Sequence, residues 1–244
     1  MSVGTCSASF GCTGWLEFST QGYGIIRRED GGTSWSTTSL TASQEDGHIT
    51  VIRFNPANSM TVFAAGSRGI YKSLDNGKTW NQVFSTTTSS TLNNIRFIDL
   101  EIALGDTNNI CASSIKIGGA NTTDSTARVF CSSNGGNTFV NRTPEKVCEY
   151  TISGSTTNFN RGAFAIALDV SPADSSNIYA FFASGSPYYG IPESATLCKT
   201  SNAGQNWSEI FDQSGSTAST VLNVQGGRWG RYRYQFELSD SSTD

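Results

Sequence analysis

The chain has 244 residues, of which 15% are charged and 36% hydrophobic, and its formal net charge is −4 at pH 7. This balance lacks the basic footprint of a nucleic-acid-binding protein, and no run of about 18 apolar residues could form a membrane-spanning helix. The length suits one all-β domain or a repeat array with a sizeable core. The first residues, MSVGTCSASFG, have neither a basic nor an apolar signal-peptide region, so we expect no signal peptide in this chain.

Four similar segments follow one another, and each predicts four short strands joined by hairpin-type links. The segments span about residues 5–40, 48–85, 97–143 and 163–212, and the first is the most compressed. A tail, residues 213–244, predicts a closing strand or the start of a further repeat. Strands are predicted at 48–54, 61–66, 69–73 and 79–85; at 97–104, 110–117, 127–132 and 138–143; and at 163–170, 178–184, 195–200 and 206–212.

One turn sequence recurs in every segment, most clearly as SLDNGKTW at residues 73–80. An Asp or Asn side chain can accept hydrogen bonds from backbone N–H groups two or three residues later and so close a turn. The Gly that follows supplies backbone angles that other residues avoid, and we expect the final aromatic residue to pack onto the core. The three positions are Asp30, Gly32 and Trp35; Asp75, Gly77 and Trp80; Asn134, Gly136 and Phe139; and Asn202, Gly204 and Trp207.

Two adjacent apolar residues precede each turn. Adjacent side chains of a strand point to opposite faces, so these strands are expected to be buried on both sides, inside a stack of sheets. Three inserts, residues 118–126, 144–162 and 185–194, lengthen the later segments, and we expect them to be loops on one edge. The apolar pairs are Ile25-Ile26, Ile70-Tyr71, Val129-Phe130 and Leu197-Cys198.

The turns resemble the Asp-box, the S-x-D-x-G-x-T-W motif of BNR-repeat β-propellers, over roughly residues 15–212. SLDNGKTW matches the motif in full, whereas Arg28 replaces its Ser, Asn134 and Asn202 replace its Asp, and Asn206 replaces its Thr. The resemblance implies an all-β propeller of four-stranded antiparallel blades, with the boxes on the outer edge of each blade. The motif occurs in sialidases, xyloglucanase-type glycoside hydrolases, sortilin-like receptors and photosystem assembly factors.

The resemblance implies six, seven or ten blades, whereas this chain holds four, or five with the tail. An unclosed ring of sheets leaves exposed edges. We therefore expect one propeller domain over residues 1–244 that belongs to a longer propeller, or that the tail closes as a small one.

The sequence matches the catalytic residues of these enzyme families only weakly. A sialidase needs an arginine cluster, a Tyr–Glu pair and a catalytic Asp, and its Arg-Ile-Pro signature is absent. A xyloglucanase-type enzyme needs two facing carboxylates. His48 beside Asp46 suggests either a dyad or a loop histidine that caps a strand. The candidates are Arg53, Arg96 and Arg161 for the cluster, and Asp46, Asp99 and Glu101 for the carboxylates.

Aromatic residues in the predicted loops and tail suggest a binding surface, because aromatic faces with polar tips suit sugars and protein partners. Tyr188 and Tyr189 lie in the last insert, and Trp229 lies in the tail. In the tail, Tyr232 and Tyr234 alternate with Arg233 at period two, which is also typical of an ordinary strand.

Six cysteines allow fifteen complete pairings. Cys6 with Cys12 could clip the N-terminal loop, Cys111 with Cys131 lies on predicted neighbouring strands, and Cys148 with Cys198 remains. Without a CxxC motif and with one histidine, we expect no zinc site and no cofactor. Glycosylation signals occur at Asn121, Asn141 and Asn206, the last inside a turn.

These features predict a secreted or cell-surface protein, in a mature form or as a fragment. The leading function is a non-catalytic binding or structural module that recognises glycan or protein through loops on one propeller face. One alternative is a glycoside hydrolase of sialidase or xyloglucanase type. Another is a subunit of an extracellular assembly or filament that associates with copies of itself.

Overall fold

The structure, a computed structural model, consists of β-strands in every region that it describes. No helix occurs in these regions, and hence none that could cross a membrane. The all-β class predicted from the sequence is confirmed. The described residues are 24–29, 31–41, 48–86, 95–116, 127–144, 165–171, 174–186 and 191–213.

The strands form a two-stranded first sheet and three four-stranded sheets, all antiparallel, and each strand pairs with the next along the chain. The first sheet contains β1 (Gly24–Arg27) and β2 (Ser36–Thr41). The second contains β3 (Ile49–Asn55), β4 (Asn58–Gly66), β5 (Gly69–Ser73) and β6 (Asn81–Ser85). The third contains β7 (Ile95–Ile102), β8 (Ile110–Lys116), β9 (Val129–Ser132) and β10 (Val140–Asn141). The fourth contains β11 (Ala165–Ser171), β12 (Asp174–Ser186), β13 (Ile191–Thr200) and β14 (Ser208–Gln213).

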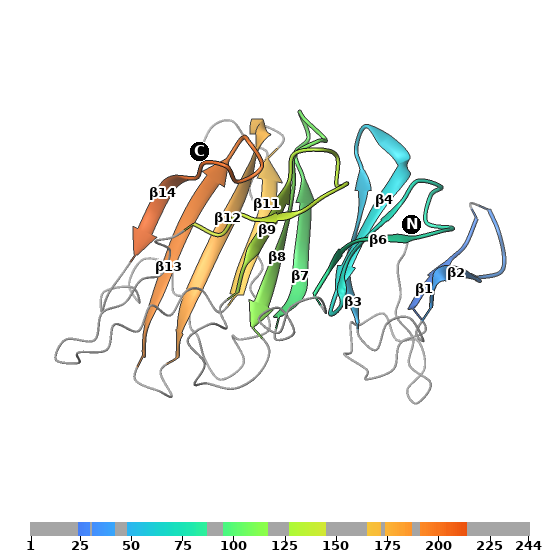
Figure 1. The fold of residues 1–244 in the computed structure, drawn as a ribbon, viewed down its shortest axis with the longest axis horizontal. Coiled ribbons are helices and arrows are strands. Elements are labelled where there is room, and N and C mark those ends of the chain that lie inside the picture. The colour runs from blue at the N-terminus through green and yellow to red at the C-terminus, as the bar shows by residue number, and fades with distance from the viewer. Residues whose placement is uncertain are drawn as a thin grey trace.

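The four sheets stand side by side in chain order, with the first and the fourth at opposite ends of the row (Figure 1). The first strands of the larger sheets lie together, since β3 contacts β7 and β7 contacts β11. Four-stranded antiparallel sheets stacked in this way are the blades of a β-propeller. The chain thus forms part of a propeller, as the sequence predicted.

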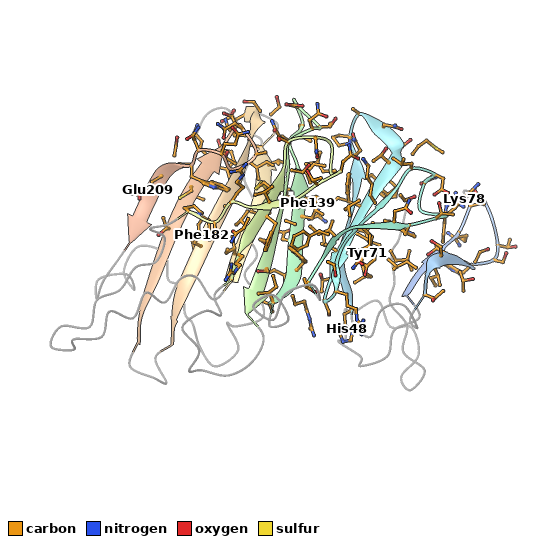
Figure 2. All side chains as sticks on the ribbon, in the orientation of Figure 1. His48, Tyr71, Lys78, Phe139, Phe182 and Glu209 are labelled. Atoms are coloured by element: carbon orange, nitrogen blue, oxygen red, sulfur yellow. A yellow bond between two sulfur atoms is a disulfide. The ribbon has the colours of Figure 1, made fainter. Side chains whose placement is uncertain are left out.

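The hydrophobic cores lie between successive sheets and fill the spaces between the ribbons (Figure 2). Ile70 on β5 packs into the core shared with Phe97 of the third sheet, whereas its neighbour Tyr71 packs into the core shared with Ile25 of the first sheet. The exposed fractions of Ile70 and Tyr71 are 0% and 6%. The prediction that the strand before the turn is buried on both faces is therefore confirmed for β5.

The structure corrects the prediction that residues 185–194 are a loop. β12 continues to Ser186 and β13 begins at Ile191, and these two residues pair with each other. Backbone groups of antiparallel strands can pair whatever their side chains, so the ladder continues beyond the apolar run that marks the strands in the sequence. The start of β12 also lies earlier than predicted, at Asp174, inside the expected link.

The second turn is held by two side chains, Ser73 and Asp75. Asp75 accepts hydrogen bonds from the backbone N–H of Thr79 at 2.8 Å and from its hydroxyl at 2.6 Å. Ser73, which is 0% exposed, accepts one from the N–H of Gly77 at 2.8 Å and donates one to Asp75 at 2.8 Å. Asn76 and Gly77 both have positive φ, 56° and 80°. These bonds hold a backbone that most residues avoid.

The third and fourth turns keep this geometry with an amide in place of the carboxylate. Oδ1 of Asn134 accepts a bond from the backbone N–H of Thr138 at 3.0 Å, and Oδ1 of Asn202 accepts one from that of Asn206 at 2.9 Å. Nδ2 of Asn134 donates to the Thr138 hydroxyl at 2.9 Å. Because a hydroxyl can donate or accept, the amide of Asn134 replaces the carboxylate in the third turn without losing a bond.

The first turn departs from the other three. Arg28 stands where the others have a buried hydroxyl, and of its two glycines Gly31 has positive φ, 69°, whereas Gly32 does not. Trp35 is 45% exposed, and the Arg28 guanidinium lies 5.3 Å from its ring centre. The expectation that this aromatic residue packs onto the core is therefore wrong for Trp35. Asp30 lies outside the described residues.

Neighbouring turns are tied by a cation that precedes the hydroxyl position. Arg27 donates from Nε to the carbonyl of Asn76 at 2.8 Å, and Lys72 donates from Nζ to the carbonyl of Gly135 at 2.7 Å. The residue that supplies each acceptor immediately precedes the positive-φ glycine of the next turn motif. The side chain of one blade thus fixes the turn of the following blade.

The third segment has Cys131 at this cation position, and there a disulfide replaces the tie. Cys131 is bonded to Cys111, which lies directly opposite it on β8. Cys198 is buried in the same core. Its proposed pairing stays a prediction, because three of the cysteines lie outside the described residues: Cys6, Cys12 and Cys148.

Ser73→Ala is expected to lower the free energy of unfolding by about 2 kcal/mol, because the buried N–H of Gly77 loses its acceptor. Urea unfolding followed by tryptophan fluorescence measures this loss. Ser73→Thr is the matched control, since Thr200 accepts the equivalent bond from Gly204 at 2.9 Å in the fourth turn. If the Ala variant unfolds at the same urea concentration as the native chain, the hydroxyl does not hold the turn.

Candidate functional site on the inner strands

The first strands of the three large sheets are joined by polar side chains. Thr50 on β3 donates to the carbonyl of Phe97 on β7 at 2.5 Å. Asp99 on β7 accepts a bond from the backbone N–H of Leu168 on β11 at 2.9 Å. Side chains from three blades therefore meet along the inner strands.

One arginine binds two carboxylates at this junction. Arg53 on β3 donates to Oε1 of Glu101 from Nε at 2.9 Å and from Nη2 at 2.6 Å. Nη2 also lies 3.3 Å from Oδ1 of Asp99. Asp99 and Glu101 are two positions apart on β7, so their side chains emerge on the same side of the strand. The sequence analysis named Arg53, Asp99 and Glu101 as candidates, and the structure brings these three residues together.

The carboxylates of this cluster are covered, whereas the guanidinium reaches solvent. The exposed fractions of the side chains are 41% for Arg53, 19% for Asp99 and 12% for Glu101. Solvent or a ligand can therefore reach Arg53 directly. The two acids lie beneath it.

Burial dominates the ionisation of the cluster. It raises the pKa of Glu101 to about 7, although the hydrogen bond and charge of Arg53 act against it. It likewise raises the pKa of Asp99 against the N–H of Leu168 and the charge of Arg53. For Arg53, burial lowers the pKa, but the hydrogen bond and charge of Glu101 outweigh it and raise the pKa overall.

Asp169 on β11 belongs to the same charged group and was missed from the sequence. Its charge further raises the pKa of Glu101 and of Asp99. The signal was present in the repeats: Ile52-Arg53-Phe54, Leu100-Glu101-Ile102 and Leu168-Asp169-Val170 each place one charge between two apolar residues near the end of the first strand. Aligning the turns alone did not reveal this position.

The two carboxylates bound by Arg53 are close together. Because Oε1 of Glu101 and Oδ1 of Asp99 both lie within 3.3 Å of Nη2, they are at most about 6 Å apart, a spacing that excludes the roughly 6.5–9.5 Å of inverting glycosidases. It resembles the shorter spacing of retaining enzymes. Here, however, a guanidinium lies against both acids.

The other predicted catalytic residues do not join this cluster in the described structure. Arg96 lies five positions before Glu101 on β7, which is roughly 15 Å along a strand. Burial and then the charge of Arg96 lower the pKa of His48, so these two residues are neighbours. The arginine cluster of a sialidase is not assembled from Arg53 and Arg96.

Several predicted site residues lie outside the described residues or at the surface. Asn141 on β10 is exposed, and its Oδ1 accepts a bond from the Thr143 hydroxyl at 2.7 Å. Glycosylation there stays a prediction. The candidates outside the described residues are Asp46, Asn121, Arg161, Tyr188, Tyr189, Trp229, Tyr232, Arg233 and Tyr234.

Comparison with known proteins supports the fold. The chain is similar to the GH74 xyloglucanase from Xanthomonas campestris, with 14% identity and a TM-score of 0.51, over 80% of this chain and 27% of the enzyme. It thus spans about a quarter of that enzyme's length. No protein-family model and no curated protein matches the chain.

Two further structures are similar at lower scores. One is an ancestral GH74 enzyme, with 13% identity and a TM-score of 0.42, over 79% of this chain and 28% of the enzyme. The other is an exo-β-1,3-galactanase from Clostridium thermocellum, with 12% identity and a TM-score of 0.28, over 66% of this chain and 47% of the enzyme. The class defined by the fold is a partial β-propeller.

Glu101→Gln is expected to flatten the pH dependence of stability. A raised folded-state pKa gives a contribution that is fully present below the unfolded pKa, near 4.5, and is lost as the pH rises through about 7. Glu101 should therefore cost the native chain about 3 kcal/mol of unfolding free energy between pH 4 and pH 8. A glutamine keeps an oxygen for Arg53 and has no charge to bury.

Chemical denaturation at closely spaced pH values measures this difference. Glu209→Gln, at an exposed position on β14, is the matched control and should follow the native curve. His48, whose pKa is lowered by burial and by the charge of Arg96, is present in all three proteins, so its contribution cancels in the difference between the curves. Parallel curves for the native chain and Glu101→Gln would show that the carboxyl is not buried as described.

Proposed function

We propose that this chain is part of an extracellular propeller that binds a neutral glycan at the inner-strand cluster and does not cleave it. The observation that carries the proposal is the pairing of solvent-reachable Arg53 with Asp99 and Glu101 at the junction of three blades. The Cys111–Cys131 disulfide supports an oxidising, extracellular setting. The similarity of fold to the xyloglucanase supports a role with glycans.

The chemistry of the cluster matches sugar hydroxyl groups. A hydroxyl can accept a bond from Arg53 and donate one to a carboxylate oxygen, and bonds to charged groups are the stronger ones. Asp99, Glu101 and Asp169 place three acids around one guanidinium, so the cluster has little attraction for an anionic ligand. This favours neutral polysaccharides over sialosides.

The position of Arg53 argues against catalysis. A glycosidase needs the sugar ring and its bridging oxygen between its two acids. In this structure Nη2 of Arg53 lies against both Asp99 and Glu101, at 3.3 and 2.6 Å. The space that a reacting bond needs is occupied by the guanidinium.

Glycoside hydrolysis is the second candidate, and one observation favours it. The pKa of Glu101 is raised to about 7 by burial, the range of a general acid that protonates a leaving group near neutral pH. If a substrate displaced Arg53, Asp99 would be near enough for a retaining mechanism. Glycoside hydrolysis by this cluster therefore requires Arg53 to move away from the two carboxylates.

We further propose that the repeated turns are Asp-boxes of the BNR type. In three of them the backbone N–H of the motif glycine donates a hydrogen bond to a side-chain hydroxyl. The distances are 2.8 Å for Ser73, 2.9 Å for Ser132 and 2.9 Å for Thr200. Their position before the last strand of each sheet supports a structural role. Loop recognition through Tyr188 and Tyr189 remains part of this proposal.

The folded chain should retain xyloglucan and other neutral β-glucans, and galactan, without releasing shorter products. Affinity electrophoresis measures retention and mass spectrometry of the supernatant measures cleavage, with sialosides included in the panel. At pH 8, above the pKa of about 7 of Glu101, Glu101→Gln should weaken retention about tenfold, because a charged hydrogen-bond acceptor is lost. Glu209→Gln, at an exposed position on β14, the last strand of the fourth sheet, is the matched control and should bind as the native chain does.

Shorter products, abolished by Glu101→Gln, would establish the hydrolase instead. Retention of sialosides alone would contradict the choice of a neutral ligand. If no glycan is retained, the binding proposal is wrong.

A further inference from the structure

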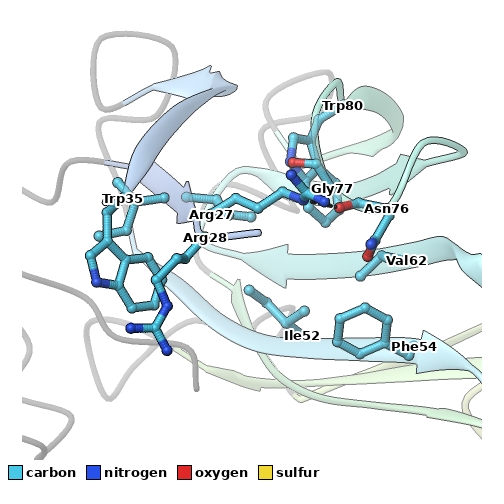
Figure 3. A pocket seen from close by; sticks show the side chains of 11 residues that line it. Arg27, Arg28, Trp35, Ile52, Phe54, Val62, Asn76, Gly77 and Trp80 are labelled. Atoms are coloured by element: carbon cyan, nitrogen blue, oxygen red, sulfur yellow. Dashed lines mark hydrogen bonds between the residues drawn. The ribbon is translucent and has the colours of Figure 1, made fainter. Parts of the chain in front are cut away.

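An apolar pocket lies between the first and second sheets (Figure 3). Its free volume, counted out to the open mouth, is about 370 Å³, which is at the small end of the range for ligand pockets. A pocket of this size suits a molecule with one ring rather than a polymer chain. Its wall includes Ile25, Arg28 and Trp35 from the first sheet and its turn, and Ile52, Phe54 and Val62 from the second sheet.

This pocket is separate from the charged cluster on the inner strands. Ile52 and Phe54 flank Arg53 on β3, and adjacent side chains of a strand point to opposite faces. Arg53 binds Glu101 on β7, in the third sheet, at 2.6 Å, whereas Ile52 packs against the core shared with the first sheet. A ligand in the pocket would therefore lie on the other face of the second sheet from the proposed glycan site.

One cation in the pocket wall has no carboxylate partner among the described residues. Arg27 binds Glu29, with Nη2 at 2.9 Å from Oε2, so the charges of these two residues offset each other. The guanidinium of Arg28 interacts, in the part of the chain that the structure describes, with the ring of Trp35 at 5.3 Å from its centre. A guanidinium carries five N–H donors. Those of Arg28 are therefore available to an anionic ligand.

The indole N–H of Trp35 is a second donor beside this guanidinium. In the second and fourth turns the corresponding N–H is bonded to a carbonyl, since Trp80 donates to Gly77 at 3.1 Å and Trp207 donates to Arg142 at 2.7 Å. Trp35 forms no such bond within the described structure, and 45% of this residue is exposed. The pocket thus combines an apolar wall with two hydrogen-bond donors, one of them charged.

We propose that this pocket binds a small aromatic carboxylate. The ring of the ligand lies against Ile52 and Phe54, and its carboxylate accepts hydrogen bonds from Arg28, whose planar fork of donors matches that group. The apolar wall disfavours a sugar, because the sugar hydroxyl groups would be buried there without partners. The charge of Arg28 disfavours a cationic ligand. This site does not depend on the glycan-binding proposal, which concerns the other face of the sheet.

Two probes that differ only in charge test the proposal, para-trifluoromethylbenzoate and para-trifluoromethylbenzamide. Fluorine NMR of each probe, titrated with the full folded chain at pH 7, gives its dissociation constant. We expect the benzoate to bind about fivefold more tightly than the benzamide, the scale of an exposed ion pair. Arg28→Gln should remove this preference and leave binding of the benzamide unchanged. Lys78→Gln, which removes a cation of the second turn outside the pocket, is the matched control and should keep the preference.

The native chain gives a second measurement, which holds even if the Arg28 variant fails to fold. In proton–nitrogen NMR spectra the indole N–H signal of Trp35, identified by its loss in Trp35→Phe, should shift when the benzoate is added. The signal of Trp207, whose N–H is bonded to the carbonyl of Arg142, should stay in place. Phe54→Ala should weaken binding of both probes alike, because it removes part of the apolar wall and no charge.

Each other result overturns the proposal. If the benzoate does not bind, or binds no more tightly than the benzamide, the pocket does not select an anion. A preference that survives Arg28→Gln would assign the carboxylate to another cation. A shift of the Trp207 signal without one of the Trp35 signal would place the ligand outside this pocket.

Discussion

Burial of each sheet on both faces is the constraint on which this structure depends. A four-stranded sheet whose third strand carries Ile70 on one face and Tyr71 on the other needs a neighbour on each side to remove both side chains from water. Stacking then continues from blade to blade. The turns between the strands are held by their own side chains and by Arg27 and Lys72 of the preceding blade.

The charged cluster on the inner strands follows from the same stacking. Where first strands from three blades converge, side chains at their ends are removed from water together. An isolated carboxylate there would be costly, and Arg53 offsets this cost for Asp99 and Glu101 at once. Such a buried ion pair adds little net stability compared with apolar packing.

The sequence predicted the repeated turns and the two-sided burial, because both rest on local patterns of a few residues. Cys111 and Cys131 were one of the pairings it left open, since strand neighbours could be inferred but not registers. The exposure of Trp35 was not predicted, although the sequence already shows Arg28 in place of the hydroxyl residue of the turn. The sequence could not join Arg53 to Glu101, 48 positions later, since the order and spacing of blades decide that contact. Asp169 could have been predicted as a member of the cluster if the first strands had been aligned as well as the turns.

In each repeat, the residues that hold the turn and the charged residue of the first strand lie in different parts of the blade. The turns before the last strands keep one geometry whether the key residue is Asp75, Asn134 or Asn202, so they tolerate only substitutions that preserve the same bonds. The first strands hold a single variable charge between two apolar neighbours, as Arg53, Glu101 and Asp169. Changing that charge replaces no side chain of the turn or of either core, and it alters the chemistry and the pH dependence of stability where the blades meet. A fold built in this way can acquire or lose a binding site by substitutions at one position per repeat, because the residues that specify the blade lie elsewhere.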